Sequence, residues 1–285
     1  MSKTAVVTDS TAYIPEEMMQ DLPLHSIPLQ VIWGGETFRD GIDIQPMELY
    51  TRLKHAKVMP STSQPSPAAF EQVYNSLLEE NFDIISIHIS DKLSGTIASA
   101  IQAKQNIQSE RIAIIDSESA SMGLGFVALE VARAAQNGAS FDDCLQLTKK
   151  IVPTSNAIFT VSTLEFLHRG GRIGGASAFL GTALGVKPIL ALKDGKIIAI
   201  EKVRTMTKAI DRLLDIFSER VAGKSHIHLS TLHANAPVDA EKLLNQVCNR
   251  VPSNHILEAF VTNVSPAIGT HTGPGTVGLA WIALE

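Results

Sequence analysis

The chain has 285 residues, of which 45% are hydrophobic and 19% charged, and its formal net charge at pH 7 is −5. This composition is typical of a globular protein with a substantial core and excludes an intrinsically disordered chain. The negative net charge disfavours a nucleic-acid-binding surface, so we expect no nucleic-acid partner. The sequence shows neither a membrane-spanning apolar run nor a signal-peptide pattern. We therefore expect a cytoplasmic protein with no integral membrane segment.

Strands and helices alternate along the first half of the chain. Short apolar runs predict strands over residues 5–8, 25–33, 84–89 and 111–115, and amphipathic stretches predict helices that begin near residues 15, 47, 66, 94 and 122. Strands that are separated by helices of this length indicate a parallel sheet.

The pattern changes after Pro153. Strands are predicted over residues 157–161, 188–192, 196–200, 226–231, 256–263 and 277–283, with helices over residues 208–222 and 238–251. Asp194-Gly195 between two apolar runs predicts a hairpin. We therefore predict an α/β protein of two domains. The N-terminal domain, residues 1–153, has a parallel sheet, and the C-terminal α+β domain, residues 154–285, has a mixed sheet.

The cysteines and histidines show no pattern of a metal site. Cys144 and Cys248 lie far apart within helical patterns, which predicts two buried free thiols. The nine histidines show no spacing with cysteines or carboxylates that would suit a metal ion. We expect no metal and no cofactor.

The loop between the strand at 84–89 and the next helix is the segment most suggestive of ligand binding. Ser94, Gly95 and Thr96 stand at the predicted helix N-terminus, where unpaired N–H groups and the helix dipole favour an anion. Such a site would suit a carboxylate or a phosphate. The alternative is that Ser94 simply caps its helix.

Other polar loops follow predicted strands of the same domain. They comprise residues 9–11, which include Asp9 and Ser10, the hydroxyl-rich residues 61–65, and Asp116-Ser117. In open parallel sheets, ligands bind beyond the carboxyl ends of the strands, so these loops are expected to converge. Ordinary turn and cap chemistry is the alternative interpretation of each loop.

Two arginines, an uncharged segment and a histidine mark the second half. Arg169 and Arg172 flank a pair of glycines, and a guanidinium is suited to fixing a carboxylate or phosphate. A helix C-terminus would account for Arg169 equally well. Residues 176–186 predict an apolar helix rich in small residues, which either packs tightly or leaves room for an apolar ligand, with packing favoured. His271 lies in a turn rich in glycine and proline.

These motifs, taken together and in order, resemble the DegV family of bacterial fatty-acid-binding proteins. The matching pieces are residues 7–11, 61–65, 93–96, 116–117, 167–173, 187–189, 203–205 and 271–275. The resemblance implies a two-domain α/β fold with a long-chain fatty acid at the domain junction. It also implies a set of site residues. The carboxylate would be held by Thr62, Ser94, Gly95 and Thr96, the polar surround would be Arg172, Arg204, His271, Arg169, Asp9 and Ser10, and the acyl tail would lie against Phe179, Leu180, Leu184 and Ile189.

The resemblance further implies a partner. In such proteins a separate ATP-dependent fatty acid kinase subunit phosphorylates the bound carboxylate, and the acyl phosphate enters phospholipid synthesis. The chain carries no Walker motif and no Gly-x-Ser-x-Gly elbow, so we expect a non-catalytic lipid-binding subunit. The alternative is a serine-dependent hydrolase or acyltransferase with Ser94 as nucleophile and His271 as base. That reading requires a third, orienting group, which the sequence does not clearly supply.

Overall fold

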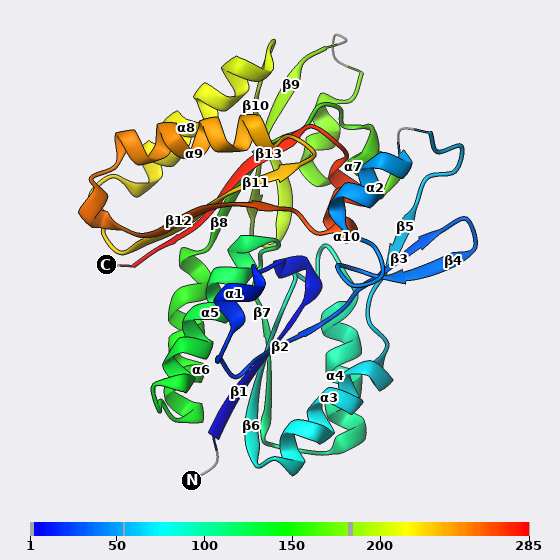
Figure 1. Cartoon of the computed structure of the whole chain (residues 1–285), viewed down its shortest axis with the longest axis vertical. Helices are drawn as coiled ribbons and strands as arrows, with labels where there is room; N and C mark the ends of the chain where they lie inside the picture. Colours follow the sequence, from blue (N-terminus) through cyan, green and yellow to red (C-terminus); the bar gives the residue numbers. More distant parts are fainter. Residues whose placement is uncertain (1–2, 54, 182–184, 285) are drawn as a thin grey trace.

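The computed structural model describes residues 3–53, 55–181 and 185–284. Its lower half in Figure 1 contains a four-stranded, entirely parallel sheet. The strand order is β2 (Leu24–Ile27), β1 (Lys3–Asp9), β6 (Phe82–His88) and β7 (Ile112–Asp116). The predicted parallel sheet of the N-terminal half is confirmed.

Helices cover both faces of the parallel sheet because its strands are apolar on both sides. Along β1, Ala5 and Val7 pack against α3 (Pro67–Glu79) and α4 (Thr96–Ile107), whereas Val6 packs on the opposite face. That opposite face is covered by α5 (Met122–Gln136) and α6 (Phe141–Ile151). Side chains that alternate between two buried faces are expected in a parallel sheet.

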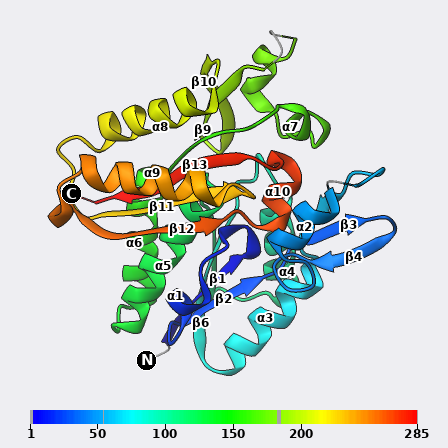
Figure 2. The same ribbon diagram turned by 45° about the horizontal axis from the view of Figure 1, so that its top comes forward.

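The upper half contains a six-stranded mixed sheet, as predicted. Its order is β10 (Lys196–Val203), β9 (Lys187–Lys193), β8 (Asn156–Thr160), β13 (Thr276–Ala283), β11 (Ile227–Ala234) and β12 (Ile256–Asn263). The β11–β12 pair is parallel and the other pairs are antiparallel. Helices α8 (Met206–Val221) and α9 (Pro237–Arg250) cover the face that points away from α5 and α6 (Figure 2).

Helix α5 lies between the two sheets, and one hydrophobic core spans the junction. On β13, Ala280 and Ile282 face α5, whereas Leu279 and Trp281 face α8 and α9. The predicted boundary at residue 153 falls in the short turn η2 (Val152–Thr154), directly before β8. The division into two domains at that residue stays a prediction.

A small sheet projects from one side of the molecule (Figure 1) and corrects two predictions. Its order is β4 (Glu36–Arg39), β3 (Gln30–Trp33) and β5 (Ser61–Ser63), and α2 (Pro46–Leu53) lies beside it. The prediction of one strand over residues 25–33 was wrong, because the chain leaves the parallel sheet after Ile27 and passes Pro28, which cannot donate to a ladder. Residues 61–63, predicted as a loop, pair with β3.

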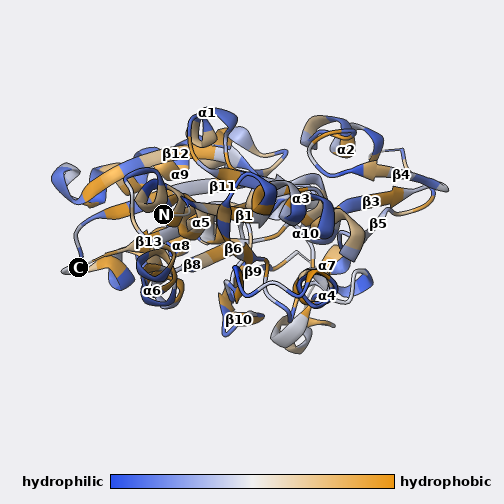
Figure 3. Cartoon of the chain, turned by 90° about the horizontal axis from the view of Figure 1, so that it is seen from below, coloured by the Kyte–Doolittle hydropathy of each residue, from blue (hydrophilic) through white to orange (hydrophobic). Residues whose placement is uncertain are grey.

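Short elements complete the chain: η1 (Ser10–Ala12), α1 (Glu16–Met19), α7 (Glu165–Arg169), η3 (Gly174–Phe179), η4 (Ser253–His255) and α10 (Pro266–Thr272). Helix α10 was not predicted, although Ser265 caps it and Pro266 stands at its first position. The predicted apolar helix at 176–186 is a 3₁₀ helix up to Phe179. Helices such as α2 carry both hydrophobic and hydrophilic residues (Figure 3), as expected of elements with one buried face.

The exposure of the two cysteines and the character of the helices can be compared with the predictions from the sequence. Cys144 is buried as predicted, but Cys248 is exposed, because α9 turns only one side toward the core. Within the described ranges, every helix is too short or too polar to cross a lipid bilayer.

Candidate functional site

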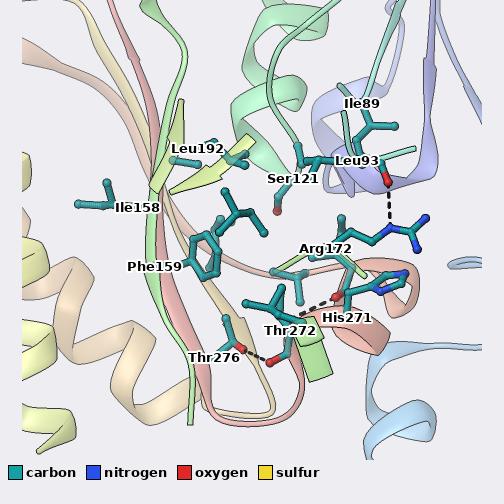
Figure 4. A pocket seen from close by; sticks show the side chains of 18 residues that line it. Ile89, Leu93, Ser121, Ile158, Phe159, Arg172, Leu192, His271, Thr272 and Thr276 are labelled. Atoms are coloured by element: carbon teal, nitrogen blue, oxygen red, sulfur yellow. Dashed lines mark hydrogen bonds between the residues drawn. The ribbon is translucent and has the colours of Figure 1, made fainter. Parts of the chain in front are cut away.

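A largely apolar cavity lies where the loop after β6 meets the six-stranded sheet and α10. Its walls include Ile89 and Leu93 from the loop, Phe159 from β8, Leu192 from β9 and Ile268 from α10. The space between its atoms is about 700 Å³ including the open mouth, of which about 90 Å³ can hold the centre of a water molecule. Figure 4 shows the cavity with its polar and apolar sides.

The polar side of the cavity is formed by Arg172 and His271 (Figure 4). Arg172 follows the Gly170-Gly171 pair that ends α7. Its Nε donates to the carbonyl oxygen of Leu93 at 3.1 Å, and its Nη1 donates to that of Gly170 at 2.6 Å. The guanidinium therefore joins a loop of the six-stranded half to the loop that leads to Ser94.

His271 joins α10 to strand β5. Its Nε2 lies 2.7 Å from Thr62 Oγ1, while its Nδ1 is buried without a hydrogen-bond partner among the described residues. Gly170 packs directly on Nδ1, because a Cβ at this position would overlap it. A buried N–H without an acceptor is rare, so we assign the proton to Nε2, which donates to Thr62. The hydroxyl hydrogen of Thr62 is then available to another acceptor.

The surroundings of His271 favour its neutral form. Burial lowers the pKa of His271, and the nearby charge of Arg172 lowers it further, to about 4. The imidazole is therefore uncharged at pH 7, in agreement with a single proton on Nε2. An uncharged donor leaves the negative charge of a neighbouring carboxylate in place.

Backbone hydrogen bonds within the loop that carries Ser94 fix its conformation. The carbonyl of Ser90 accepts from the N–H groups of both Leu93 and Ser94, and α4 begins at Thr96 with Gly95 as its N-cap. Ser94 Oγ lies 2.8 Å from Thr96 Oγ1. Gly95 has no side chain to cap the helix, so the interpretation of Ser94 as a simple cap is not met.

Thr62 and Ser94 are brought into adjacent segments. The amide of Gln64 packs on Gly95, and a Cβ there would lie 2.9 Å from Gln64 Nε2. Neither Thr62 nor Ser94 lines the cavity itself. They stand next to His271 and Leu93, which do.

Asp9 and Ser10, which were predicted to belong to the polar surround, do not line this cavity. Asp9 is fully buried and accepts from the N–H of Ile89 at 2.9 Å and from the hydroxyl of Thr11. Ser10 donates to Asp40 at 2.6 Å. The side chains of both residues are used in these internal hydrogen bonds, and neither residue lines the cavity.

The outer arginines also lie away from the cavity. Arg169 forms an ion pair with Glu165 on the exposed side of α7. Arg204 is exposed in the turn between β10 and α8. Of the predicted polar surround, Arg172 and His271 are the described residues that line the cavity.

Phe179, Leu180 and Ile189, which were predicted to line the acyl tail, lie away from this cavity. Ile189 is buried under α8, Phe179 lies beside Lys202, and Leu180 is 41% exposed. Leu184 lies outside the described residues. None of the three described residues lines the cavity, whose apolar walls come mainly from the sheet and from the loop after β6.

The contacts of Ser94 and His271 bear on the hydrolase alternative. His271 Nε2 contacts Thr62, and Ser94 Oγ contacts Thr96. In the described part of the chain no hydrogen bond joins Ser94 to His271, which a serine nucleophile would require.

Comparison with known proteins decides the family. A family model described as "Uncharacterised protein, DegV family" matches residues 3–284. A DegV domain-containing protein of Halalkalibacterium halodurans is 36% identical over 99% of both chains. The chain belongs to the DegV family.

Solved structures of DegV proteins share the fold. A fatty-acid-binding DegV family protein from Thermus thermophilus matches with a TM-score of 0.94 at 36% identity, covering 99% of this chain and 100% of that one. DegV of Bacillus subtilis, a fatty-acid-binding protein, matches with a TM-score of 0.89 at 36% identity over the whole of both chains. The family and the α/β fold expected from the motifs are confirmed.

Proposed function

We propose that this DegV protein binds a long-chain fatty acid, with the acyl tail in the apolar cavity and the carboxylate at Thr62 and Ser94. The observation that carries the proposal is the cavity itself, which is mostly apolar and has the charged Arg172 and the imidazole of His271 on one side. Thr62 Oγ1 lies 2.7 Å from Nε2 of the cavity residue His271. The description of two structural neighbours as fatty-acid-binding supports the same ligand.

The chemistry of the cavity suits this ligand. Each buried methylene contributes roughly 0.8 kcal/mol, so the tail supplies most of the affinity. The carboxylate needs hydrogen bonds because an unpaired buried charge is costly. Thr62 has a hydroxyl hydrogen to give, and Ser94 stands at the N-terminus of α4, whose dipole favours an anion. Neutral His271 leaves the carboxylate charged and reactive.

The protein would act without catalysis of its own. A separate ATP-dependent kinase subunit would phosphorylate the presented carboxylate in the cytoplasm, and the acyl phosphate would feed phospholipid synthesis. Two hydroxyl donors would bind the head group through hydrogen bonds and leave it unmodified, as a presenting role requires. No cofactor is required for binding.

Substitution of Thr62 tests the head-group site. Stearate affinity is measured by competition with a fluorescent fatty acid for the wild type, Thr62→Val and Ser63→Ala. Loss of a hydrogen bond to a charged group should weaken binding roughly 10- to 150-fold in Thr62→Val. Ser63→Ala, next along the same strand, should bind as the wild type does. Equal affinities of all three proteins would refute the site.

The second stage of the same experiment tests presentation. Stearate-loaded protein is mixed with a fatty acid kinase subunit and ATP, and acyl phosphate is trapped with hydroxylamine. We expect product with the wild type and none when the kinase subunit is omitted. Product formed from ATP by this protein alone would overturn the non-catalytic role.

A further inference from the structure

Ser121 is a polar residue of the cavity wall that the carboxylate site does not use. It is the N-cap residue of α5 and follows the loop after β7. The residue is 5% exposed, and its hydroxyl has no hydrogen-bond partner among the described residues. A buried hydroxyl in this situation requires an explanation.

The hydroxyl of Ser121 is directed at the cavity instead of the helix. Figure 4 shows its oxygen pointing into the space between Leu192 and Arg172. Ser121 makes no side-chain cap to α5, so the first N–H groups of this 15-residue helix also lack that acceptor. Ser119, two residues earlier, instead accepts from Ser155 at 3.0 Å and lies outside the cavity.

We propose that Ser121 and the N-terminus of α5 form a second polar subsite, which selects long-chain fatty acids that carry a hydroxyl group part-way along the chain. This inference rests on the proposed function. A saturated tail would place methylenes against an unpaired hydroxyl. A hydroxyl on the tail could accept from Ser121 or from the α5 backbone, and could donate to Ser121 in return.

The rest of the wall makes this subsite selective. The neighbouring lining residues Ile89, Ala120 and Leu192 offer no hydrogen-bonding side chain, so a hydroxyl on the tail beside them would be buried unpaired. The other lining hydroxyls, those of Thr272 and Thr276, already donate to backbone carbonyls. Preference should therefore depend on the position of the hydroxyl group. Arg172 and His271, on the polar side, are engaged by Leu93, Gly170 and Thr62.

The test compares stearic acid with monohydroxystearic acids substituted at successive carbons, in competition with a fluorescent fatty acid. The wild type should bind one isomer, or two adjacent isomers, about 3- to 10-fold more tightly than the others, as one neutral hydrogen bond allows. Ser121→Ala should lose this preference and keep its affinity for stearate. Because Ser121 has a φ of 53°, Ser121→Gly provides a second variant without backbone strain. Ser119→Ala is the matched control and should keep the preference.

The outcomes separate this inference from the proposed function. If the wild type binds stearate but ranks all hydroxy isomers alike, the subsite is refuted and fatty-acid binding stands. A preference that survives in both Ser121 variants also refutes it. If the wild type binds neither stearate nor any isomer, the proposed function fails and the subsite fails with it.

Discussion

Gly170 and His271 show how single residues set the protonation state of the site. A side chain at Gly170 would occupy the place of His271 Nδ1, so the glycine permits the close approach that excludes water from this nitrogen. The sequence singled out this pair of glycines for the arginines that flank it. It did not predict that His271 is the group approached, because α10 and α7 meet only in the folded chain.

The pH dependence of stability should report the neutral state of His271. Its folded pKa of about 4 lies below the unfolded value of 6.5, so the unfolded chain takes up a proton first. The stabilising contribution is therefore complete above pH 6.5 and is lost as the pH falls toward 4. Between pH 7 and pH 5 the wild type should lose about 2 kcal/mol that His271→Gln does not lose.

NMR titration measures this pKa directly. The His271 resonance is assigned by its absence in His271→Gln. We expect a pKa far below 6.5 in the free protein and a rise when stearate binds, because the carboxylate favours the imidazolium. An ordinary pKa in the free protein, or no rise on loading, would contradict the placement of the head group.

The hairpin of β9 and β10 contacts the loop between β6 and α4, which carries Ser94. Gly195 at its tip contacts Ser90, and a Cβ there would overlap Ser90 Oγ and lie 3.2 Å from Ser90 Cβ. Ser90 in turn organises the loop, since its Oγ accepts from the N–H of Lys92 and its carbonyl from those of Leu93 and Ser94. The hairpin therefore fixes Ser94 from the other sheet.

A matched pair of glycine substitutions tests this contact. Gly195 and Gly223 have φ angles of 75° and 76°, but nothing lies within 4 Å of a Cβ on Gly223. Gly195→Ala should cost about 1–3 kcal/mol more in unfolding free energy than Gly223→Ala, and should weaken stearate binding where Gly223→Ala does not. Ser90→Ala should restore much of the affinity in the double variant. Equal effects of the two glycine changes would show that the tip does not position the loop.

Sequence patterns predicted most strands of the two large sheets because the spacing of apolar residues and the turn residues are read from neighbouring positions in the chain. The small sheet was missed because β4 and β5 are short and polar, and Thr62 pairs with Val31 far away in the chain. The position of Ile189 outside the cavity follows from the direction in which its side chain leaves strand β9. On β9, Ile189 faces α8 while Leu192 faces the cavity, and only pairing with β8 fixes that choice.

At the scale of the whole molecule, a charged network joins α5 to strands β11 and β12 of the six-stranded sheet. Arg133 contacts Glu258 of β12 through two bonds of 3.0 Å and Glu130 through one of 2.6 Å, and His228 of β11 lies 2.6 Å from Glu258. Burial would raise the pKa of Glu258, but hydrogen bonds from His228 and Arg133 outweigh it and lower the pKa to about 2. The network therefore stabilises the packing of α5 on the six-stranded sheet above pH 4.5, and this contribution weakens as the pH falls toward 2.

The cavity is assembled from both halves of the chain. Its walls come from the loop after β6, from the six-stranded sheet and from α10, so a fatty acid in the cavity would contact both halves of the chain. A crystal structure of the protein loaded with stearate tests this account most directly. It should show the carboxylate within about 3 Å of Thr62 Oγ1 and Ser94 Oγ, with the tail between Leu93 and Phe159. A carboxylate away from both hydroxyls, or a tail outside this cavity, would contradict it.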